Sequence, residues 1–234
     1  MAPGKGDRRG RVELKRDFTN RGTAGETTKT TLRLSVETKG LISQLRLDLP
    51  FPDAQTDFEG DITEPHLGDI KLRATFRTFP LAGAPVTSFL EATFPTADPK
   101  DLGSGKYQVS AGFRSAIPFR LWDTLPASHR LTFRPFLQQI LSVAGDPDFK
   151  DINYTKLDLA VRDTWRKTYW FIAKVKPVVD WRQNAATGAT GEVEFGGFLS
   201  RIFSAWVTAG ARLWGSSVPS TYDHRVSAAL AADF

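Results

Sequence analysis

The chain ends in "RVSAALAADF" (residues 225–234), where every second residue is apolar. A strand with this period carries on one face Val226, Ala228, Leu230, Ala232 and Phe234. Chain ends are usually polar and poorly ordered unless the structure ties them down. The ending therefore predicts a terminal strand that pairs with the first strand and closes a sheet.

The same alternation recurs along the chain, for example in "GDIKLRATFRTF" (68–79) and "YWFIAKVKPVVDW" (169–181). A short helix is the alternative for "FLQQILSVA" (136–144). The alternation predicts about twelve strands. Their expected spans are 11–18, 27–38, 41–51, 69–79, 86–94, 107–119, 130–143, 154–164, 168–181, 192–202, 205–214 and 222–234.

The connections between these strands alternate in length, with "PDAQTDFEGDITEPHLG" (52–68) long and "WRK" (165–167) short. Only "RLWDTLPASH" (120–129) breaks the rhythm. Outer-membrane barrels have long extracellular loops and short periplasmic turns. In a soluble sandwich, nothing in the architecture makes long and short connections alternate. The pattern predicts an all-β, antiparallel up-and-down transmembrane β-barrel in the outer membrane of a Gram-negative bacterium, with both termini on the short-turn side.

Composition agrees with this class. The 234 residues include no cysteine, carry a net charge of +5, and contain no apolar run long enough for a membrane-spanning helix. Strands that alternate between lipid and lumen keep the average hydropathy modest, here −0.28. The opening "MAPGKGDRRG" has charge but no apolar core, so we expect a flexible tail over 1–10 and a barrel over 11–234.

Aromatic residues concentrate where the expected strands end. Such placement is typical of the aromatic girdles at membrane interfaces, whereas a soluble core would favour aromatics at strand centres. The residues expected in the girdles are Phe51, Phe79, Phe94, Phe119, Trp165, Trp181, Phe203 and Trp206.

Three short motifs within residues 45–115 resemble the outer-membrane proteins of meta-pathway phenol degradation, which are similar to hydrocarbon-uptake barrels. The motifs are a "GD" that enters a strand, a strand that ends in "PTG", and a loop with "LGxG". The matching positions are Gly68 and Asp69, then Pro95 and Thr96, then Leu102, Gly103 and Gly105. Ala97 departs from the pattern. The resemblance implies a barrel that moves small apolar or aromatic compounds.

The alternation turns the charged faces inward, where basic residues outnumber acidic ones. Rings of Lys and Arg in a pore favour anions. Opposite charges that pair across strands and fill the lumen are the alternative. The residues expected to line the solute path are Arg46, Lys71, Arg73, Arg77, Arg114, Arg134, Lys174 and Lys176.

Catalysis and cofactors find little support in the sequence. The three histidines, His66, His129 and His224, fall on different strands, and no serine flanks the one with acids nearby, His66. The acids of 52–68, such as Asp57, Glu59 and Asp61, and those of "DPDFKD" (146–151) lack the remaining ligands of a Ca²⁺ loop. We expect no enzyme activity, no metal, no cofactor and no nucleic-acid partner.

The sequence therefore predicts an outer-membrane channel for small solutes, with an aromatic carboxylate as the expected substrate class. A barrel with a closed lumen and an anchoring or structural role is the alternative, and an outer-membrane hydrolase is a further one. The expected partners are outer-membrane lipid, the small solute, and the barrel-assembly machinery, which would read the C-terminal strand that ends in Phe234.

Overall fold

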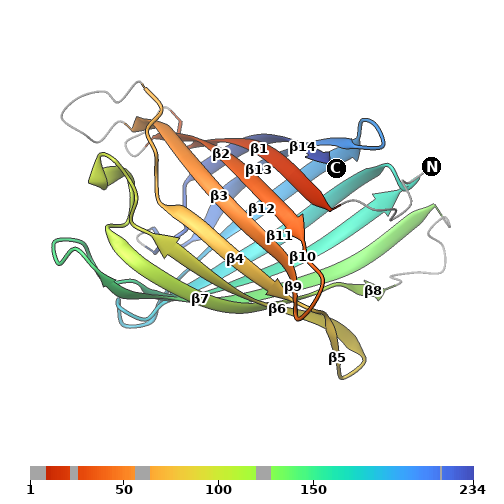
Figure 1. Ribbon diagram of the computed structural model, residues 1–234, viewed down its shortest axis with the longest axis horizontal. Helices are drawn as coiled ribbons and strands as arrows, with labels where there is room; N and C mark the ends of the chain where they lie inside the picture. Colours follow the sequence, from red (N-terminus) through yellow and green to blue (C-terminus); the bar gives the residue numbers. More distant parts are fainter. Residues whose placement is uncertain (1–8, 22–25, 56–63, 120–127, 217) are drawn as a thin grey trace.

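The computed structural model describes residues 9–21, 26–55, 64–119, 128–216 and 218–234. Its sheet is antiparallel throughout and closes on itself (Figure 1). The wall consists of β1 (Gly10–Thr19), β2 (Thr27–Glu37), β3 (Ile42–Gln55), β4 (Ile70–Phe76), β6 (Ala84–Phe94), β7 (Lys106–Ser115), β9 (His129–Gly145), β10 (Asn153–Trp165), β11 (Tyr169–Asp180), β12 (Ala186–Phe198), β13 (Phe203–Trp214) and β14 (His224–Asp233). The predicted twelve-stranded barrel is confirmed.

Three short elements supplement the wall. β5 (Phe79–Leu81) pairs with β6, β8 (Ile117–Phe119) pairs with β9, and η1 (Lys100–Leu102) is a single 3-10 turn. No helix among the described residues is long and apolar enough to cross a membrane. The helix considered for 136–144 is wrong because this stretch lies within β9. The strand expected at 192–202 begins six residues earlier than predicted, as β12.

The barrel closes between β1 and β14, where Leu14 pairs with Leu230 in an antiparallel register. The carbonyl oxygen of Phe234 accepts hydrogen bonds from the amides of Arg9 at 2.7 Å and Gly10 at 2.9 Å, and its own amide donates to Gly10 at 3.0 Å. A Cβ on Gly10 would lie 2.4 Å from the Phe234 ring, so the ring packs directly against this glycine. The predicted closing strand is confirmed. The tail expected over 1–10 lies mostly outside the described residues.

The connections sort to two ends of the barrel. One end, here called the turn end, holds the tight connections 38–41, 166–168 and 199–202 and both termini (Figure 1). The opposite end, the loop end, holds the connections that include 95–105, 146–152 and 215–223. An even number of wall strands places both termini together, as the sequence predicts. The exceptional connection 120–129 lies mostly outside the described residues.

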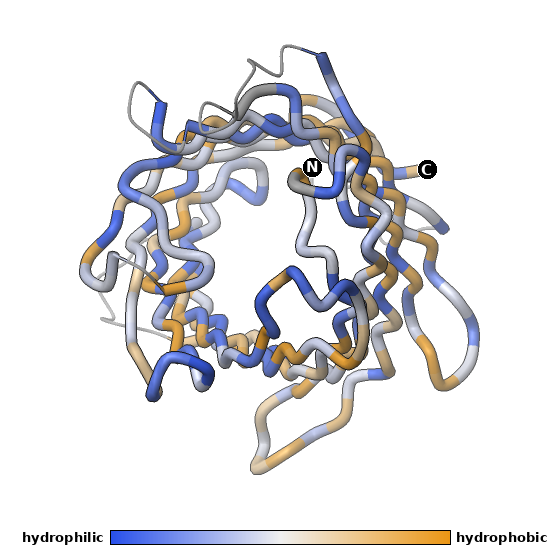
Figure 2. Tube along the Cα trace, turned by 90° about the vertical axis from the view of Figure 1, so that its left-hand side faces the viewer, coloured by the Kyte–Doolittle hydropathy of each residue, from blue (hydrophilic) through white to orange (hydrophobic). Residues whose placement is uncertain are grey.

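The two faces of the wall differ in chemistry. Along each strand apolar and polar residues alternate, as the mixed colours of the tube in Figure 2 show in a view along the barrel. Outward apolar side chains are exposed because no protein covers them. They include Leu45, Leu72, Val109, Phe113, Phe171, Val175, Val226 and Leu230.

The aromatic girdle is confirmed at several strand ends and wrong at one position. Phe79, Phe94, Trp181 and Phe203 are exposed on the outer surface. Trp206 instead turns into the lumen, where its ring centroid lies 6.4 Å from that of Trp170. It belongs to a buried cluster inside the barrel because it shares the inward parity of β13 with the buried Ser204 and Thr208.

Candidate functional site

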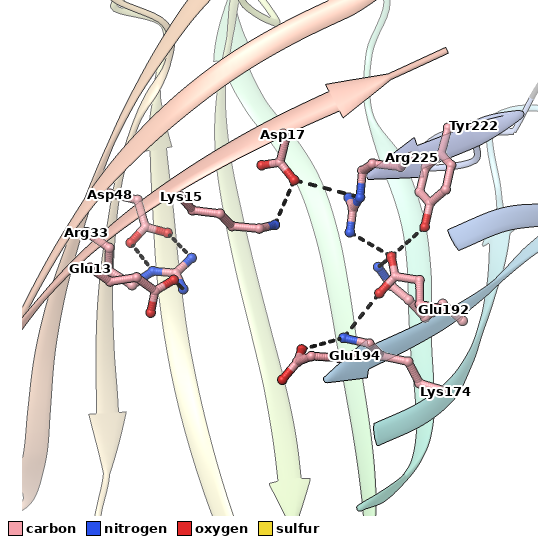
Figure 3. Close-up of polar contacts among 11 residues, drawn as sticks. Glu13, Lys15, Asp17, Arg33, Asp48, Lys174, Glu192, Glu194, Tyr222 and Arg225 are labelled. Atoms are coloured by element: carbon pink, nitrogen blue, oxygen red, sulfur yellow. Dashed lines mark hydrogen bonds and ion pairs between the residues drawn. The ribbon is translucent and has the colours of Figure 1, made fainter. Parts of the chain in front are cut away.

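A belt of ion pairs crosses the middle of the lumen. Arg33 of β2 binds Asp48 of β3 at 2.8 Å and Glu13 of β1 at 3.0 Å (Figure 3). Arg46 continues the belt, at 3.1 Å from Asp48 and 3.0 Å from Glu91. Charges from β1, β2, β3 and β6 are thereby neutralised in pairs. The carboxylate side chains of Glu13, Asp48 and Glu91 are at most 9% exposed, and acids buried in this way require such partners.

Arg73 extends the belt along β4. Its guanidinium lies 2.7 Å from Glu91 and 4.1 Å from the centroid of the Phe89 ring. Phe89 is almost fully buried and stacks on Phe136 at 5.4 Å. This part of the lumen is therefore filled by a salt bridge packed against aromatic rings.

Glu192 of β12 is the centre of a second ionic cluster on the opposite wall (Figure 3). Its carboxylate lies 3.0 Å from Lys176, 3.2 Å from Lys174 and 2.6 Å from Arg225. The hydroxyl of Tyr222 donates to it at 2.5 Å. The Glu192 side chain is only 1% exposed, so its carboxylate has lost its hydration. The three cations offset the cost of that loss by pairing with the negative charge.

Residues of β1 and β11 extend the Glu192 cluster. Asp17 accepts from Lys15 at 2.8 Å and lies 3.8 Å from Arg225, and Lys174 also contacts Glu194 at 3.5 Å. Most inward charges at mid-height are therefore paired across strands. The alternative of a charge-paired lumen holds for this part of the barrel.

A cavity of about 1660 Å³, here called the vestibule, lies at the loop end. Its lining includes Lys29 of β2 and Lys71 of β4, neither of which forms an ion pair within the described part of the chain. The acids of the lining have partners of their own. Asp69 accepts from Ser104 at 2.6 Å, Asp151 lies 3.2 Å from Lys106, and Asp180 accepts from the Arg182 amide at 2.9 Å. The vestibule therefore has a basic wall.

A smaller cavity of about 440 Å³, here called the turn-side chamber, lies beyond the belt toward the turn end. Arg114 of β7 and Arg134 of β9 line it together with Phe136, Ala160 and Ile172. Neither arginine has an ion-pair partner among the described residues. The chamber thus combines uncompensated guanidinium groups with an apolar floor.

The segment 218–222 folds against the inner wall of the vestibule. Val218 and Tyr222 are buried, and a Cβ on Gly188 would lie 2.8 Å from Thr221. A Cβ on Gly210 would lie 2.7 Å from the Tyr222 hydroxyl. Glycines in β12 and β13 therefore leave the space that this segment occupies. No sequence signal predicted this inward fold, because it depends on which residues face each other across the barrel.

The family-like motifs converge at the rim of the vestibule. Asp69 accepts hydrogen bonds from the amide and hydroxyl of Ser104, both at 2.6 Å. Thr96 donates its hydroxyl to the Gly68 carbonyl at 2.9 Å, and the Ile70 amide donates to Thr96 at 3.0 Å. Their role here is to tie the connection 95–105 to β4.

Glycine geometry completes this rim. A Cβ on Gly103 would lie 2.3 Å from the Asp69 carboxylate. Gly105 has φ +61 and packs against Phe149, and it lines a cavity of about 270 Å³ together with Pro95. The "LGxG" glycines are therefore required for close packing.

The eight predicted path residues separate into three groups. Lys71, Arg114 and Arg134 line the cavities without ion-pair partners among described residues. Arg46, Arg73, Lys174 and Lys176 form salt bridges in the belt or around Glu192. Arg77 follows the end of β4 and lies at the turn end, outside both cavities.

The histidines do not assemble a catalytic group. The Nδ1 of His129 lies 2.8 Å from Asp163, and its ring stacks on Trp165 at 6.3 Å. His224 contacts the Arg21 carbonyl at 3.1 Å, and His66 donates its backbone amide to Pro52. Sequence reasoning missed the His129–Asp163 pair, which joins residues of adjacent strands.

Within the described ranges, no group of three or more His, Asp or Glu could hold a metal ion. Asp57, Glu59 and Asp61 lie outside those ranges.

No known protein-family profile matches the sequence, and no curated protein matches it. Solved structures match over nearly the whole chain. The COG4313 outer membrane channel from Pseudomonas putida F1 superimposes with a TM-score of 0.67 at 13% identity, covering 100% of both chains. The KdgM porin gives 0.60 at 9% identity, covering 96% of this chain and 99% of its own. The NanC porin gives 0.59 at 8%, covering 95% and 98%.

These likenesses concern the fold, and they are consistent across three channels. The chain has the fold of the Gram-negative outer-membrane porins and channels, with apolar residues outward and charges inward. The resemblance to the phenol-degradation proteins has no family match behind it and stays a prediction.

Proposed function

We propose that the protein is an outer-membrane channel for small solutes in a Gram-negative bacterium. The observation that carries the proposal is a closed barrel with an apolar exterior and two cavities, at opposite ends of its lumen, lined by cations without acid partners among the described residues. The similar folds are those of channels rather than enzymes, which favours a conduit over a hydrolase.

Small anions are the solutes that this lumen suits best, and we propose aromatic carboxylates among them. Lys29, Lys71, Arg114 and Arg134 supply positive charge in the vestibule and the turn-side chamber. The KdgM porin, which shares the fold, has been observed in complex with disordered oligogalacturonate, a carboxylate-bearing compound. The apolar floor beside Phe136 adds a surface for rings.

Conductance in a planar bilayer with a salt gradient tests the channel. We expect ion conduction with a preference for anions that weakens at high ionic strength, because the Debye length falls from about 10 Å at 0.1 M to about 3 Å at 1 M. Lys71→Gln should lower the preference and leave the barrel folded, since lumen substitutions mainly tune selectivity. Lys167→Gln, which removes the same charge from an exposed turn outside both cavities, is the matched control.

A closed barrel with a structural role is the second candidate, favoured by the belt and by the inward segment 218–222. Absence of conductance from a barrel shown to be folded would support it and overturn the channel. Outer-membrane lipid is the proposed surrounding for either function. The barrel-assembly machinery is the proposed partner of the strand that ends in Phe234.

A further inference from the structure

Three arginines share one inward patch at the turn end. Arg114 pairs in register with Phe136, Arg134 lies two residues from Phe136 on the same face of β9, and Ala160 pairs with Arg134. Arg162 lies two residues beyond Ala160 on β10. The inward face of three consecutive wall strands, β7, β9 and β10, therefore carries one arginine on each strand, with a phenylalanine and an alanine between them.

These arginines repel one another, and Glu194 offsets part of the charge of Arg162. Arg134 interacts electrostatically with both Arg114 and Arg162, and no salt bridge joins any of the three to a described residue. The belt arginines Arg46 and Arg73, in contrast, both bind Glu91. Like charges gathered in this way favour the binding of an anion.

The acids that line the turn-side chamber are compensated by other groups. Glu194 accepts from the Trp170 indole at 2.9 Å and from Lys174 at 3.5 Å. Asp158 interacts electrostatically with Lys176, Lys156 and Lys174, of which Lys174 lines the chamber itself. The guanidinium groups therefore remain available to a solute, and Arg114 and Arg134 are both exposed to the chamber.

The apolar part of the chamber fits a ring. Phe136 stacks on the buried Phe89, which fixes its plane, and Ile172 belongs to a buried cluster with Ala160 and Trp170. Ala160 keeps the floor open because its side chain is short. A volume of about 440 Å³ lies within the usual range of small-molecule sites, about 300–1,000 Å³.

We propose that the turn-side chamber is a binding site for monocyclic aromatic carboxylates, with Arg114 and Arg134 on the carboxylate and Phe136 and Ile172 against the ring. The inference deepens the proposed channel function by naming its substrate class. The planar guanidinium can bind a carboxylate with two parallel hydrogen bonds, which a lysine cannot do. Arg162, held 5.0 Å above the Trp170 ring, adds positive charge behind them.

Binding to the detergent-solubilised barrel tests the site without requiring transport. Saturation-transfer NMR would compare benzoate with acetate, which lacks the ring, and with benzyl alcohol, which lacks the charge. We expect benzoate to bind at least about fivefold more tightly than either, and Arg114→Gln or Arg134→Gln to weaken it about fivefold or more. Arg134→Lys should recover only part of the loss.

Arg166→Gln is the matched control, because it removes the same charge from an exposed turn outside the chamber. Equal binding of benzoate by the wild type and by Arg114→Gln/Arg134→Gln, with the barrel folded, would overturn the site. Variant-sensitive binding without benzoate current in a bilayer would overturn the channel and leave the site. Benzoate current without saturable binding would overturn the site and leave the channel.

Discussion

At the scale of single residues, the carboxylate of Glu192 contacts three cations and one hydroxyl, and its side chain is 1% exposed. Its charge therefore balances Lys174, Lys176 and Arg225 together. Removing one member of a buried ionic group leaves the others uncompensated, which costs more than the loss of a single surface pair.

We expect Glu192→Gln to lower the free energy of unfolding by about 3 kcal/mol and to raise anion preference in the lumen. Urea unfolding in lipid vesicles measures the first effect, and the reversal potential in a salt gradient measures the second. Glu37→Gln, which changes the same charge at an exposed position, should change neither quantity measurably. A Glu192→Gln variant as stable as the wild type would contradict the role given to this group.

The sequence predicted on which face of a strand each side chain lies, but not which residue it contacts. Period-two alternation identified Arg73 and Glu91 as inward, because each strand has only two faces. Their salt bridge depends on the register of β4 against β6. Apolar alternation does not fix that register, because sliding one strand by two residues keeps every side chain on the same face. Tyr222 was missed as a lumen residue because it precedes β14, in a connection whose inward fold no strand alternation describes.

At the scale of elements, β12 shows where alternation fails. Its first half, "ATGATG" (186–191), consists of small residues, so no apolar face marks it as a strand. The structure explains the composition, because Gly188 lies beneath Val218 and Thr221. The strands that carry large outward apolar residues were predicted well because lipid contact requires those residues.

The connection 146–152 is tied to its surroundings by Asp151, which lies 3.2 Å from Lys106 and 2.6 Å from Arg182. The hydrogen bond from Lys106 lowers the pKa of Asp151 below its usual value. A lowered pKa means that the contact is fully present above the ordinary aspartate range, near 3.9, and is lost only as pH falls through the lower value.

We expect the ¹³C carboxyl resonance of Asp151, followed in detergent micelles, to titrate with a midpoint below that of an ordinary aspartate. Lys106→Gln should raise the midpoint toward the ordinary value, because it removes the hydrogen bond that lowers the Asp151 pKa most. Lys150→Gln changes the adjacent charge and is the control that should shift the midpoint less. Equal shifts in the two variants would show that general charge, and not the Lys106 contact, lowers the pKa.

At the scale of the whole molecule, Phe234 joins the two ends of the wall through its backbone and lays its ring against Gly10. We expect deletion of Phe234 to reduce the fraction of heat-modifiable barrel recovered from cells. Loss of three hydrogen bonds, about 1 kcal/mol each, weakens the closure itself. Gel migration with and without boiling measures the folded fraction.

Phe234→Ala separates the ring from the backbone, because it keeps the terminal hydrogen bonds. If the assembly machinery reads the ring, this variant should fail in cells and still refold in lipid vesicles. An equal defect in both settings would show that the ring acts in the barrel itself and would contradict the proposed partner.

The β1–β14 closure also decides the order in which the barrel can form. Neighbouring wall strands otherwise follow one another in the chain, so hairpin contacts are local and form early. The Arg11–Asp233 contact spans 222 residues and forms only when the last strand is present. Its added loop entropy is small, about 0.6 kcal/mol per doubling of length. The larger burden is kinetic, because every earlier intermediate exposes two unpaired edges to its surroundings. Circular permutation at a turn would preserve the barrel and transfer that late step to a different pair of strands.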